Sequence, residues 1–237
     1  MIIYERKLAI LNYLKKNNLA TFRELAEAVF SSESSVRRDV KALENEGYVK
    51  QTYGGVVLAS YFGGVIPVKL RESENAAVKD SIAERATKHV FDGATLLMDG
   101  SSTVRRMMKY LDRFSGLKII TNNHRLFSEN EGFSGALYST GGRYDSKNNI
   151  FLGSTAEDFL RGISADVLFF SCQAISDVGE ITDVSEEETS LRRVMLARAK
   201  KKIFLCDSSK VGKRQTFRLC SKDDVDEIIC DKKLPWE

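Results

Sequence analysis

Short apolar runs alternate with longer helical stretches from residue 94 to residue 231, and this alternation restricts the fold more than any other feature. The runs have the length of buried strands, and the segments between them have helical periodicity. Strands and helices that alternate in this way form a largely parallel sheet covered by helices. The sequence therefore predicts an α/β domain. Its strands are expected in the runs 94–99, 117–123, 135–142, 165–172, 201–207 and 225–231, and its helices in the stretches 79–91, 103–114, 153–163 and 186–201.

The N-terminal part of the chain is organised differently and begins with helices. An apolar stripe predicts a helix over residues 4–17. Thr21 and Glu24 have the spacing of a capping box, which predicts the start of a second helix. A third helix is expected from about residue 33 to residue 46, because Gly47 is the residue type that ends helices. Three short helices are therefore expected before residue 48.

A β-hairpin is predicted directly after these helices. Residues 48–59 place β-forming residues on both sides of a turn at residues 53–55, which contains two glycines. Three helices followed by a hairpin form a winged helix-turn-helix, in which one helix enters the major groove of DNA and the hairpin lies beside the backbone. The sequence predicts this domain over residues 1–58.

The third helix has an apolar face and a polar face. At about 100° per residue, Val36, Val40 and Leu43 fall in one narrow sector and are expected to be buried. The opposite face presents hydroxyl groups and cations, which contact phosphates and base edges. Two arginines on a helix are more often a solvated surface, but the ordered set of helices and hairpin favours DNA binding. The residues expected at the DNA are Ser34, Ser35, Arg37, Arg38, Lys41 and, in the hairpin, Tyr53.

Residues 59–78 have no sustained period and contain two adjacent glycines and a proline. Such composition is typical of a linker. The expected organisation is therefore a DNA-binding domain at 1–58, a linker at 59–78 and a larger α/β domain at 79–237.

Three predicted strands end in segments that combine glycine, hydroxyl and charged side chains. Ligands of parallel sheets bind at the carboxyl ends of the strands. One such turn is more often an ordinary connection, but three in one sheet favour a site. Serine, arginine and lysine would hold a phosphate there, and carboxylates would hold a polyol. The segments are Asp99-Gly100-Ser101-Ser102-Thr103, Thr140-Gly141-Gly142-Arg143 and Asp207-Ser208-Ser209-Lys210.

The first domain resembles the N-terminal domain of DeoR-type transcriptional regulators. The resemblance is carried by Ser35-Val36-Arg37-Arg38-Asp39-Val40, by Glu46-Gly47-Tyr48-Val49 and by Gly54-Gly55 in the hairpin. Ser35 replaces the threonine of the family pattern, and Tyr53 replaces its histidine. Both replacements keep a hydrogen-bonding group, so we expect DNA binding with a different operator preference.

The resemblance continues to the end of the chain, at residues 99–103, 121–122, 141–143, 153–156 and 207–212. The C-terminal domain of this family resembles sugar-phosphate isomerases and binds phosphorylated sugars. The resemblance implies a regulator, usually a repressor, of carbohydrate metabolism genes that a phosphorylated sugar releases from operator DNA. It also places Asn122 and Gly153 in the effector site. The segment Ser171-Cys172-Gln173-Ala174-Ile175 departs from the glycine-rich family pattern, which indicates a different pocket shape.

Composition excludes several other classes. The 237 residues carry a net charge of only +3, which by itself does not indicate nucleic acid. No apolar run approaches the roughly 20 residues that span a bilayer, and the N-terminus lacks the features of a secretory signal. We therefore expect a cytoplasmic protein without a membrane partner. The four cysteines form no C-x-x-C pair, and no phosphate-binding or dinucleotide-binding glycine motif is present, so neither a metal nor a cofactor is expected.

Two other functions remain open at this level. A sugar-phosphate isomerase or deaminase would need a carboxylate base, for which Asp99, Asp177 or Asp183 is available, with Lys210 as the electrophile. A fused DNA-binding domain favours sensing over catalysis. Alternatively, the larger domain would bind no effector and would only assemble the protein. A homo-oligomer, either a dimer or a tetramer, is expected in each case in which the chain binds DNA.

Overall fold

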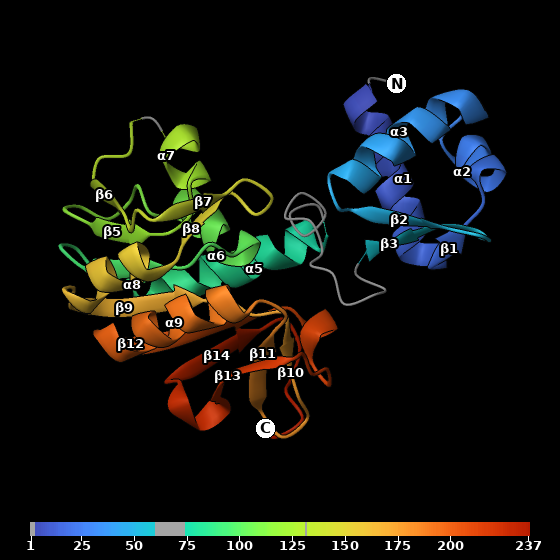
Figure 1. Cartoon of the computed structure of the whole chain (residues 1–237). Coiled ribbons are helices and arrows are strands. Elements are labelled where there is room, and N and C mark those ends of the chain that lie inside the picture. Colours follow the sequence, from blue (N-terminus) through green and yellow to red (C-terminus); the bar gives the residue numbers. More distant parts are fainter. Residues whose placement is uncertain (1–2, 60–73, 131) are drawn as a thin grey trace. The chain divides into compact units, whose positions relative to one another are not determined.

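The computed structural model describes residues 3–59, 74–130 and 132–237 (Figure 1). The chain separates into two compact units, Met1–Glu74 and Asn75–Glu237. Most of the linker expected at residues 59–78 lies outside the described residues, and residues 76–78 belong to a helix. Each unit buries its own apolar side chains.

The first unit contains three helices and a small antiparallel sheet, as predicted. The helices are α1 (Ile3–Asn17), α2 (Phe22–Ala28) and α3 (Glu33–Asn45), and the strands are β1 (Leu19–Ala20), β2 (Val49–Thr52) and β3 (Gly55–Leu58). The sheet order is β1-β3-β2, so the hairpin of β2 and β3 gains a short third strand that was not predicted. Apolar side chains from all three helices and from the sheet form the core.

The second unit is built on a parallel six-stranded sheet, which confirms the predicted α/β fold. The strand order is β14-β12-β9-β4-β5-β6, and every pair of neighbours is parallel. The strands are β4 (Thr95–Met98), β5 (Lys118–Thr121), β6 (Ala136–Ser139), β9 (Ala165–Phe170), β12 (Ala199–Cys206) and β14 (Glu227–Cys230).

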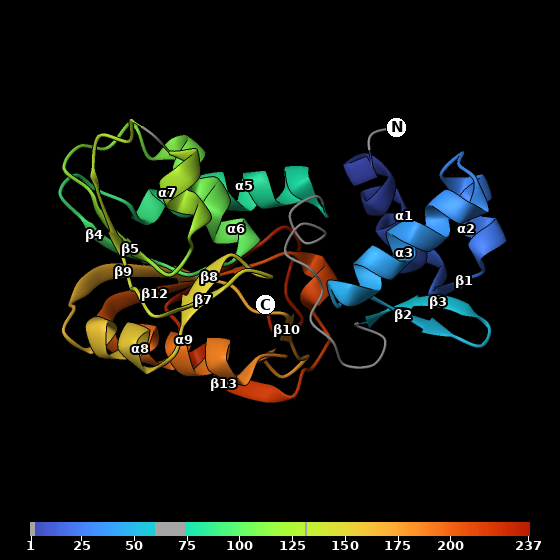
Figure 2. The same ribbon diagram turned by 45° about the horizontal axis from the view of Figure 1, so that its top comes forward.

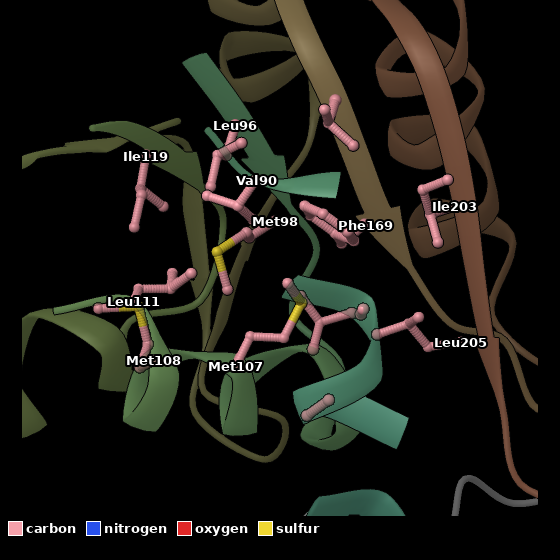
Figure 3. Packing of buried hydrophobic residues seen from close by; sticks show 14 of the residues in the cluster. Val90, Leu96, Met98, Met107, Met108, Leu111, Ile119, Phe169, Ile203 and Leu205 are labelled. Carbon is pink, nitrogen blue, oxygen red and sulfur yellow. The ribbon is translucent and has the colours of Figure 1, made fainter. Parts of the chain in front are cut away.

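Helices cover both faces of this sheet (Figures 1 and 2). Alternate residues of a strand point to opposite faces, so Leu96 and Met98 belong to one core and Leu97 to the other. Figure 3 shows the first core, where Met107 and Met108 pack beneath the strands. The helices on that face are α5 (Ala76–Ala86), α6 (Ser102–Arg105) with the 3-10 helix Arg106–Tyr110, and α7 (Arg125–Glu129), and those on the other are α8 (Ser154–Arg161) and α9 (Glu186–Arg198).

Two smaller sheets were not predicted. Strands β7 (Arg143–Asp145) and β8 (Ile150–Leu152) form an antiparallel hairpin. Strands β10 (Ala174–Ile175), β11 (Glu180–Asp183) and β13 (Phe217–Ser221) form an antiparallel sheet. These strands have only two to five residues, and β7, β11 and β13 carry charged side chains, so they lack the longer apolar runs that identify the main sheet.

Several local predictions were wrong. Ser154 and Glu157 have the sequence spacing of a capping box, which predicts Ser154 as the N-cap, but this box is absent, because α8 begins one residue earlier and Gly153 is its N-cap. Instead, Glu157 accepts a hydrogen bond of 2.7 Å from the Ser190 hydroxyl. The helix expected to reach residue 201 ends at Arg198, because residues from Ala199 onward pair with β9. The helix predicted over residues 103–114 is only a short helix followed by a 3-10 turn.

Candidate DNA-binding face and ligand site

Helix α3 is fixed in the first unit by its buried face. Val36, Val40 and Leu43 are at most 1% exposed, as predicted from their spacing. Asp39 lies on this face as well, and its carboxylate accepts a 2.5 Å hydrogen bond from Arg6 Nε of α1. The hydrogen bond to Asp39 raises the pKa of Arg6. The carboxylate of the Arg-Arg-Asp sequence therefore has a structural partner, which sequence spacing did not identify.

The opposite face of α3 presents the polar residues predicted at the DNA. Ser34, Arg37, Arg38 and Lys41 are exposed, and Ser35 is half-buried. The Arg37 guanidinium lies over the Phe22 ring, 4.1 Å from its centroid, which holds this side chain close to α2. The structure therefore places a set of cations and hydroxyl groups on one solvent-facing surface.

The hairpin turn lies beside the start of α3. A hollow of about 400 Å³ is lined by residues of α2, α3 and the turn, and it brings Arg37 together with Tyr53. The Tyr53 side chain is fully exposed. Arg23 also lines the hollow, and its side chain is 81% exposed. Arg23 was not among the predicted residues, because the first turn of α2 carries no motif that distinguishes it from a solvated arginine.

The predicted ligand-binding segments of the second unit lie at one edge of the main sheet. Strands β4, β5, β6, β9 and β12 run parallel, so the residues that follow them lie at the same carboxyl edge. Asp99 follows β4, Asn122 follows β5, Gly141 follows β6, Ser171 follows β9 and Asp207 follows β12.

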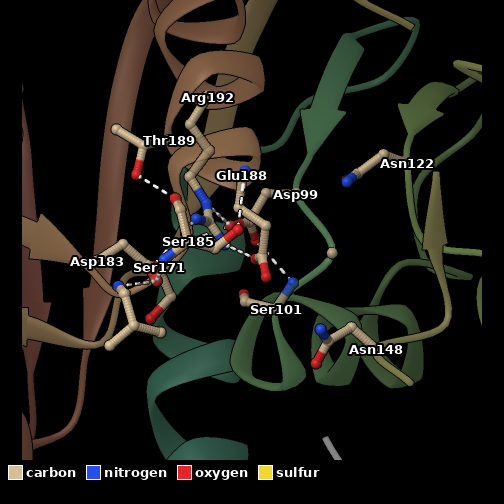
Figure 4. A network of polar contacts seen from close by, with 12 residues as sticks. Asp99, Ser101, Asn122, Asn148, Ser171, Asp183, Ser185, Glu188, Thr189 and Arg192 are labelled. Atoms are coloured by element: carbon tan, nitrogen blue, oxygen red, sulfur yellow. Dashed lines mark hydrogen bonds and ion pairs between the residues drawn. The ribbon is translucent and has the colours of Figure 1, made fainter. Parts of the chain in front are cut away.

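Asp99 belongs to a buried ionic network that is centred on Arg192 (Figure 4). Its Oδ1 accepts from Ser101 N at 3.0 Å, and its Oδ2 accepts from Arg192 Nε at 2.8 Å. Arg192 also donates to Asp183 at 3.1 Å and to Glu188 at 2.8 Å. Burial alone would lower the pKa of Arg192, but the surrounding carboxylates hold it well above its ordinary value.

This network affects the isomerase hypothesis. Asp99 and Asp183 each neutralise part of Arg192, and both are at most 3% exposed. A general base must reach a substrate proton, whereas these two carboxylates are directed at the guanidinium. Asp177, the third carboxylate considered, is exposed. Arg192 itself was missed, because it lies 93 residues from Asp99 in the sequence.

Ser171 connects the ends of three strands. Its backbone N donates to Asp99 Oδ2 at 3.2 Å, and its hydroxyl accepts from Lys210 Nζ at 2.9 Å. Lys210 lies 3.8 Å from Asp207 Oδ2. Ser171, which follows β9, thus connects the predicted segments after β4 and β12. It is the first residue of the segment 171–175, which departs from the family pattern.

Asp207 is also held by the start of α5. Its Oδ1 accepts from Asn75 Nδ2 at 3.1 Å and from the Ser209 hydroxyl. Burial alone would raise the pKa of Asp207, but Lys210, Ser209, Lys79 and Asn75 together lower it. The carboxylate is therefore ionised beside an ammonium group at the sheet edge.

Two buried polar atoms at this edge have no hydrogen-bond partner among the described residues. They are Asn122 Oδ1 and Thr103 Oγ1, whose residues are 4% and 0% exposed. A Cβ on Gly100 would lie 3.4 Å from Asn122 Oδ1 and only 2.4 Å from Ile150. Since buried polar groups are normally paired, these two atoms are available to form a hydrogen bond with a polar ligand or with water.

Gly141, Gly142 and Arg143 lie directly after β6, and Gly153 lies between β8 and α8. Gly142 has φ 103°, and a Cβ there would lie 2.6 Å from the carbonyl oxygen of Leu152. Gly141 and Gly153 adjoin open space. Arg143 is exposed, and its guanidinium donates to both carboxylate oxygens of Glu187 at 2.6 and 2.7 Å.

The cysteines are buried free thiols. Burial is the main reason that the pKa of Cys172, beside the Arg192 network, lies well above its ordinary value. No cluster of three potential metal ligands occurs in the part of the chain that the structure describes. Within residues 3–59, 74–130 and 132–237, no helix has the length and apolar character that crossing a membrane requires.

The chain matches two family models. Residues 74–232 match the DeoR C terminal sensor domain, and residues 5–50 match a winged helix-turn-helix DNA-binding model. Together the two models cover most of both units.

Curated relatives align over nearly the whole chain. The HTH-type transcriptional regulator GlpR of Haloferax volcanii is 26% identical over 99% of this chain and 92% of its own length. The HTH-type transcriptional repressor GlcR of Bacillus subtilis is 28% identical over 96% of this chain and 88% of its own. The L-fucose operon activator of Haemophilus influenzae is 29% identical over 95% and 91%. Among solved structures, ribose 5-phosphate isomerase A of Methanocaldococcus jannaschii aligns with 58% of this chain and 55% of its own at a TM-score of 0.43 and 14% identity.

Proposed function

Since the chain belongs to the DeoR family of transcriptional regulators, we propose that it binds operator DNA and is released by a phosphorylated sugar. Membership of this family confirms the resemblance predicted from the sequence. Relatives are named as regulators and repressors, and one as the activator of an L-fucose operon. Repression of carbohydrate metabolism genes is therefore the function proposed for this chain.

One structural combination supports this proposal above all. A winged helix with a basic, exposed recognition face occurs in the same chain as a sheet edge with unpaired buried polar atoms. The first feature suits double-stranded DNA, and the second suits a polar ligand. The residues proposed at the DNA are Ser34, Ser35, Arg37, Arg38, Lys41 and Tyr53.

The effector is proposed to bind along the carboxyl edge. Lys210 supplies a cation for the phosphate, and Thr103 and Asn122 supply polar atoms that have no partner among the described residues. Asp99 and Asp207 shape the edge, since both carboxylates already accept hydrogen bonds within the protein. The other residues proposed for the site are Gly100, Ser101, Ser102, Gly141, Gly142, Arg143 and Gly153.

Sensing is proposed in place of catalysis. The ion pairs of Asp99 and Asp183 with Arg192 support this, because they remove two of the three candidate bases. Turnover of a phosphopentose or hexosamine phosphate by the purified protein would contradict it.

The protein is proposed to act in the cytoplasm as a homo-oligomer. A twofold dimer would bind half-sites about 34–36 Å apart or at multiples of that spacing. Light scattering on the purified chain measures the assembly.

The direct test is thermal unfolding with sugar phosphates, each paired with its unphosphorylated parent. A ligand at about 100 times its Kd stabilises the native state by about 2.7 kcal/mol, which raises Tm by several degrees. We expect a shift with one phosphate ester and none with its parent. The same ester must then weaken operator binding in a mobility-shift assay. If no ester shifts Tm, the effector is not a sugar phosphate.

A further inference from the structure

The turn between α2 and α3 has an unusual residue at its centre. Phe30 has φ 49°, in the left-handed region, and its side chain is 93% exposed. Its N donates to Glu27 O at 3.3 Å, and Ser31 N donates to Ala26 O at 3.0 Å. These two bonds form the motif that ends many helices, in which the left-handed residue is usually glycine or asparagine.

The same unit contains the ordinary form of this motif. Gly47 ends α3 with φ 77°, where Gly47 N donates to Glu44 O and Tyr48 N donates to Leu43 O. Turns of helix-turn-helix motifs also often contain glycine. An L-residue with a side chain is strained in this region, and a bulky residue there is uncommon. Phe30 therefore makes the turn less favourable than glycine would.

Folding does not explain this phenylalanine. A ring that is 93% exposed buries almost no apolar area. Its hydrophobic stabilisation is therefore too small to offset the backbone strain. Strained residues persist where they serve a function. The ring is therefore available to contact a partner outside the folded chain.

The surroundings of Phe30 indicate what this partner is. A surface hollow contains Phe30 with Arg23, Ser32 and Glu33. The adjoining hollow shares Arg23 and Glu33 and continues to Arg37 and Tyr53. Phe30 thus lies at one end of the surface whose other end is the predicted DNA face. The exposed guanidinium groups of Arg23 and Arg37 pair with Glu27 at 3.1 Å and with Glu33 at 3.6 Å, and DNA phosphates can replace these surface carboxylates.

We propose that Phe30 contacts the 5-methyl group of a thymine at the edge of each operator half-site. The N-terminal end of a recognition helix contacts base edges, and Phe30 lies three residues before α3 begins at Glu33. Apolar side chains, phenylalanine among them, contact the thymine methyl in the major groove. The inference rests on the proposed DNA-binding function and adds a residue that determines its specificity.

The key variant is Phe30→Gly, because it should raise the stability of the protein and lower its affinity for operator DNA. Glycine relieves the left-handed strain, so Tm should rise by a few degrees. Removal of the ring should weaken operator binding. A more stable protein that binds DNA less tightly cannot be explained by misfolding. Phe30→Leu keeps an apolar side chain and should retain most of the affinity, and Phe91→Ala, an exposed phenylalanine in the other unit, is the control.

The DNA is selected from a random-sequence library by the full-length wild-type chain and, in parallel, by Phe30→Gly. We expect one thymine position in the wild-type consensus to be lost in the variant. Replacing that thymine by deoxyuridine removes only the methyl group, and wild-type affinity should fall about fourfold per half-site. The affinity of Phe30→Gly should not change with this replacement.

Each contrary outcome has one meaning. Equal affinity and an identical consensus for wild type and Phe30→Gly would overturn the proposed contact. A lower Tm for the glycine variant would overturn the strain argument from which the contact is inferred. A loss of affinity that does not depend on the methyl group would overturn the thymine contact and assign Phe30 to the sugar-phosphate backbone instead. If wild type selects no sequence, DNA binding itself fails.

Discussion

Arg192 Nε lies 2.8 Å from Asp99 Oδ2, and this buried contact joins helix α9 to the end of strand β4. The guanidinium also reaches Asp183 and Glu188, so one buried cation holds three buried carboxylates. Removing one partner of a buried ion pair leaves the other charge buried without a counter-charge. The resulting destabilisation is larger than the net stabilisation that the intact pair provides.

Arg192→Met should therefore destabilise the second unit severely. The three buried carboxylates lose their counter-charge, and the free energy of unfolding should fall by about 3–5 kcal/mol. Urea unfolding followed by circular dichroism measures the change. Arg193→Met is the matched control: Arg193 is exposed and donates one hydrogen bond, to the Arg218 carbonyl oxygen, so its replacement should lower the free energy of unfolding by about 0.5–1.5 kcal/mol. Similar losses for both variants would show that the network is not a determinant of stability.

Lys210→Met should abolish the response to effector and leave operator affinity unchanged. The loss of a charge-assisted hydrogen bond weakens binding by about tenfold or more. Isothermal titration with the active sugar phosphate measures this, and Arg143→Ala should act in the same direction. Lys213→Met, an exposed lysine three residues away, is the control. An unchanged response in both site variants would support a domain that only oligomerises.

Arg38 and Lys41 should contribute differently to DNA binding. Arg38→Ala should cost about 1–3 kcal/mol on the selected operator and less on unrelated DNA, if the guanidinium contacts a base. Lys41→Ala should weaken all sequences alike and reduce the salt slope by about one. Fluorescence anisotropy at several salt concentrations separates the two effects. If neither substitution alters affinity, the exposed face of α3 is not the DNA-binding face.

Gly142→Ala should be more destabilising than Gly141→Ala. Both glycines have positive φ, so both replacements introduce strain of about 1–2 kcal/mol. Only at Gly142 does the added Cβ lie 2.6 Å from a backbone oxygen, that of Leu152. Overpacking should add about 1–3 kcal/mol there. Chemical denaturation of the two variants in parallel gives the difference, and equal losses would contradict the close approach of the β8 backbone.

Acid should remove the contribution of Asp207 to stability. Its pKa is lower in the folded protein than the ordinary value of about 3.9. The folded state therefore favours the ionised carboxyl group. This contribution to the free energy of unfolding is fully present when the pH is above the ordinary pKa, and it is lost as the pH falls through the lower pKa of the folded protein. Wild type should be more stable than Asp207→Asn near neutral pH, and the difference should shrink below about pH 4. Urea unfolding over a pH series tests this, with the exposed Asp158→Asn as control. A constant difference would show that ionisation is not responsible.

Local sequence signals predicted local structure well. Thr21 caps α2 through Glu24, Gly47 ends α3, and Val36 and Val40 are buried, because each signal depends on residues within one or two helical turns. The capping box at Ser154 shows the limit, since Gly153 with φ 94° provides a competing helix start.

The main sheet was also predictable, because its apolar runs are long enough to identify buried strands. Contacts between distant residues were not. Arg6 with Asp39 and Arg192 with Asp99 are separated by 33 and 93 residues, and no pattern in a single sequence associates such pairs. The same holds for Ser171, which becomes part of the ligand edge only because β9 lies between β4 and β12.

The hydrogen bond from Asn75 to Asp207 connects the proposed effector site with the start of the second unit. Asn75 is the first residue of the second unit, and Asp207 is the neighbour of Lys210. If the proposed effector draws Lys210 away from Asp207, it changes the electrostatic environment of the carboxylate that accepts from Asn75. Two contacts among three side chains would then connect the proposed site with the first residue of the second unit.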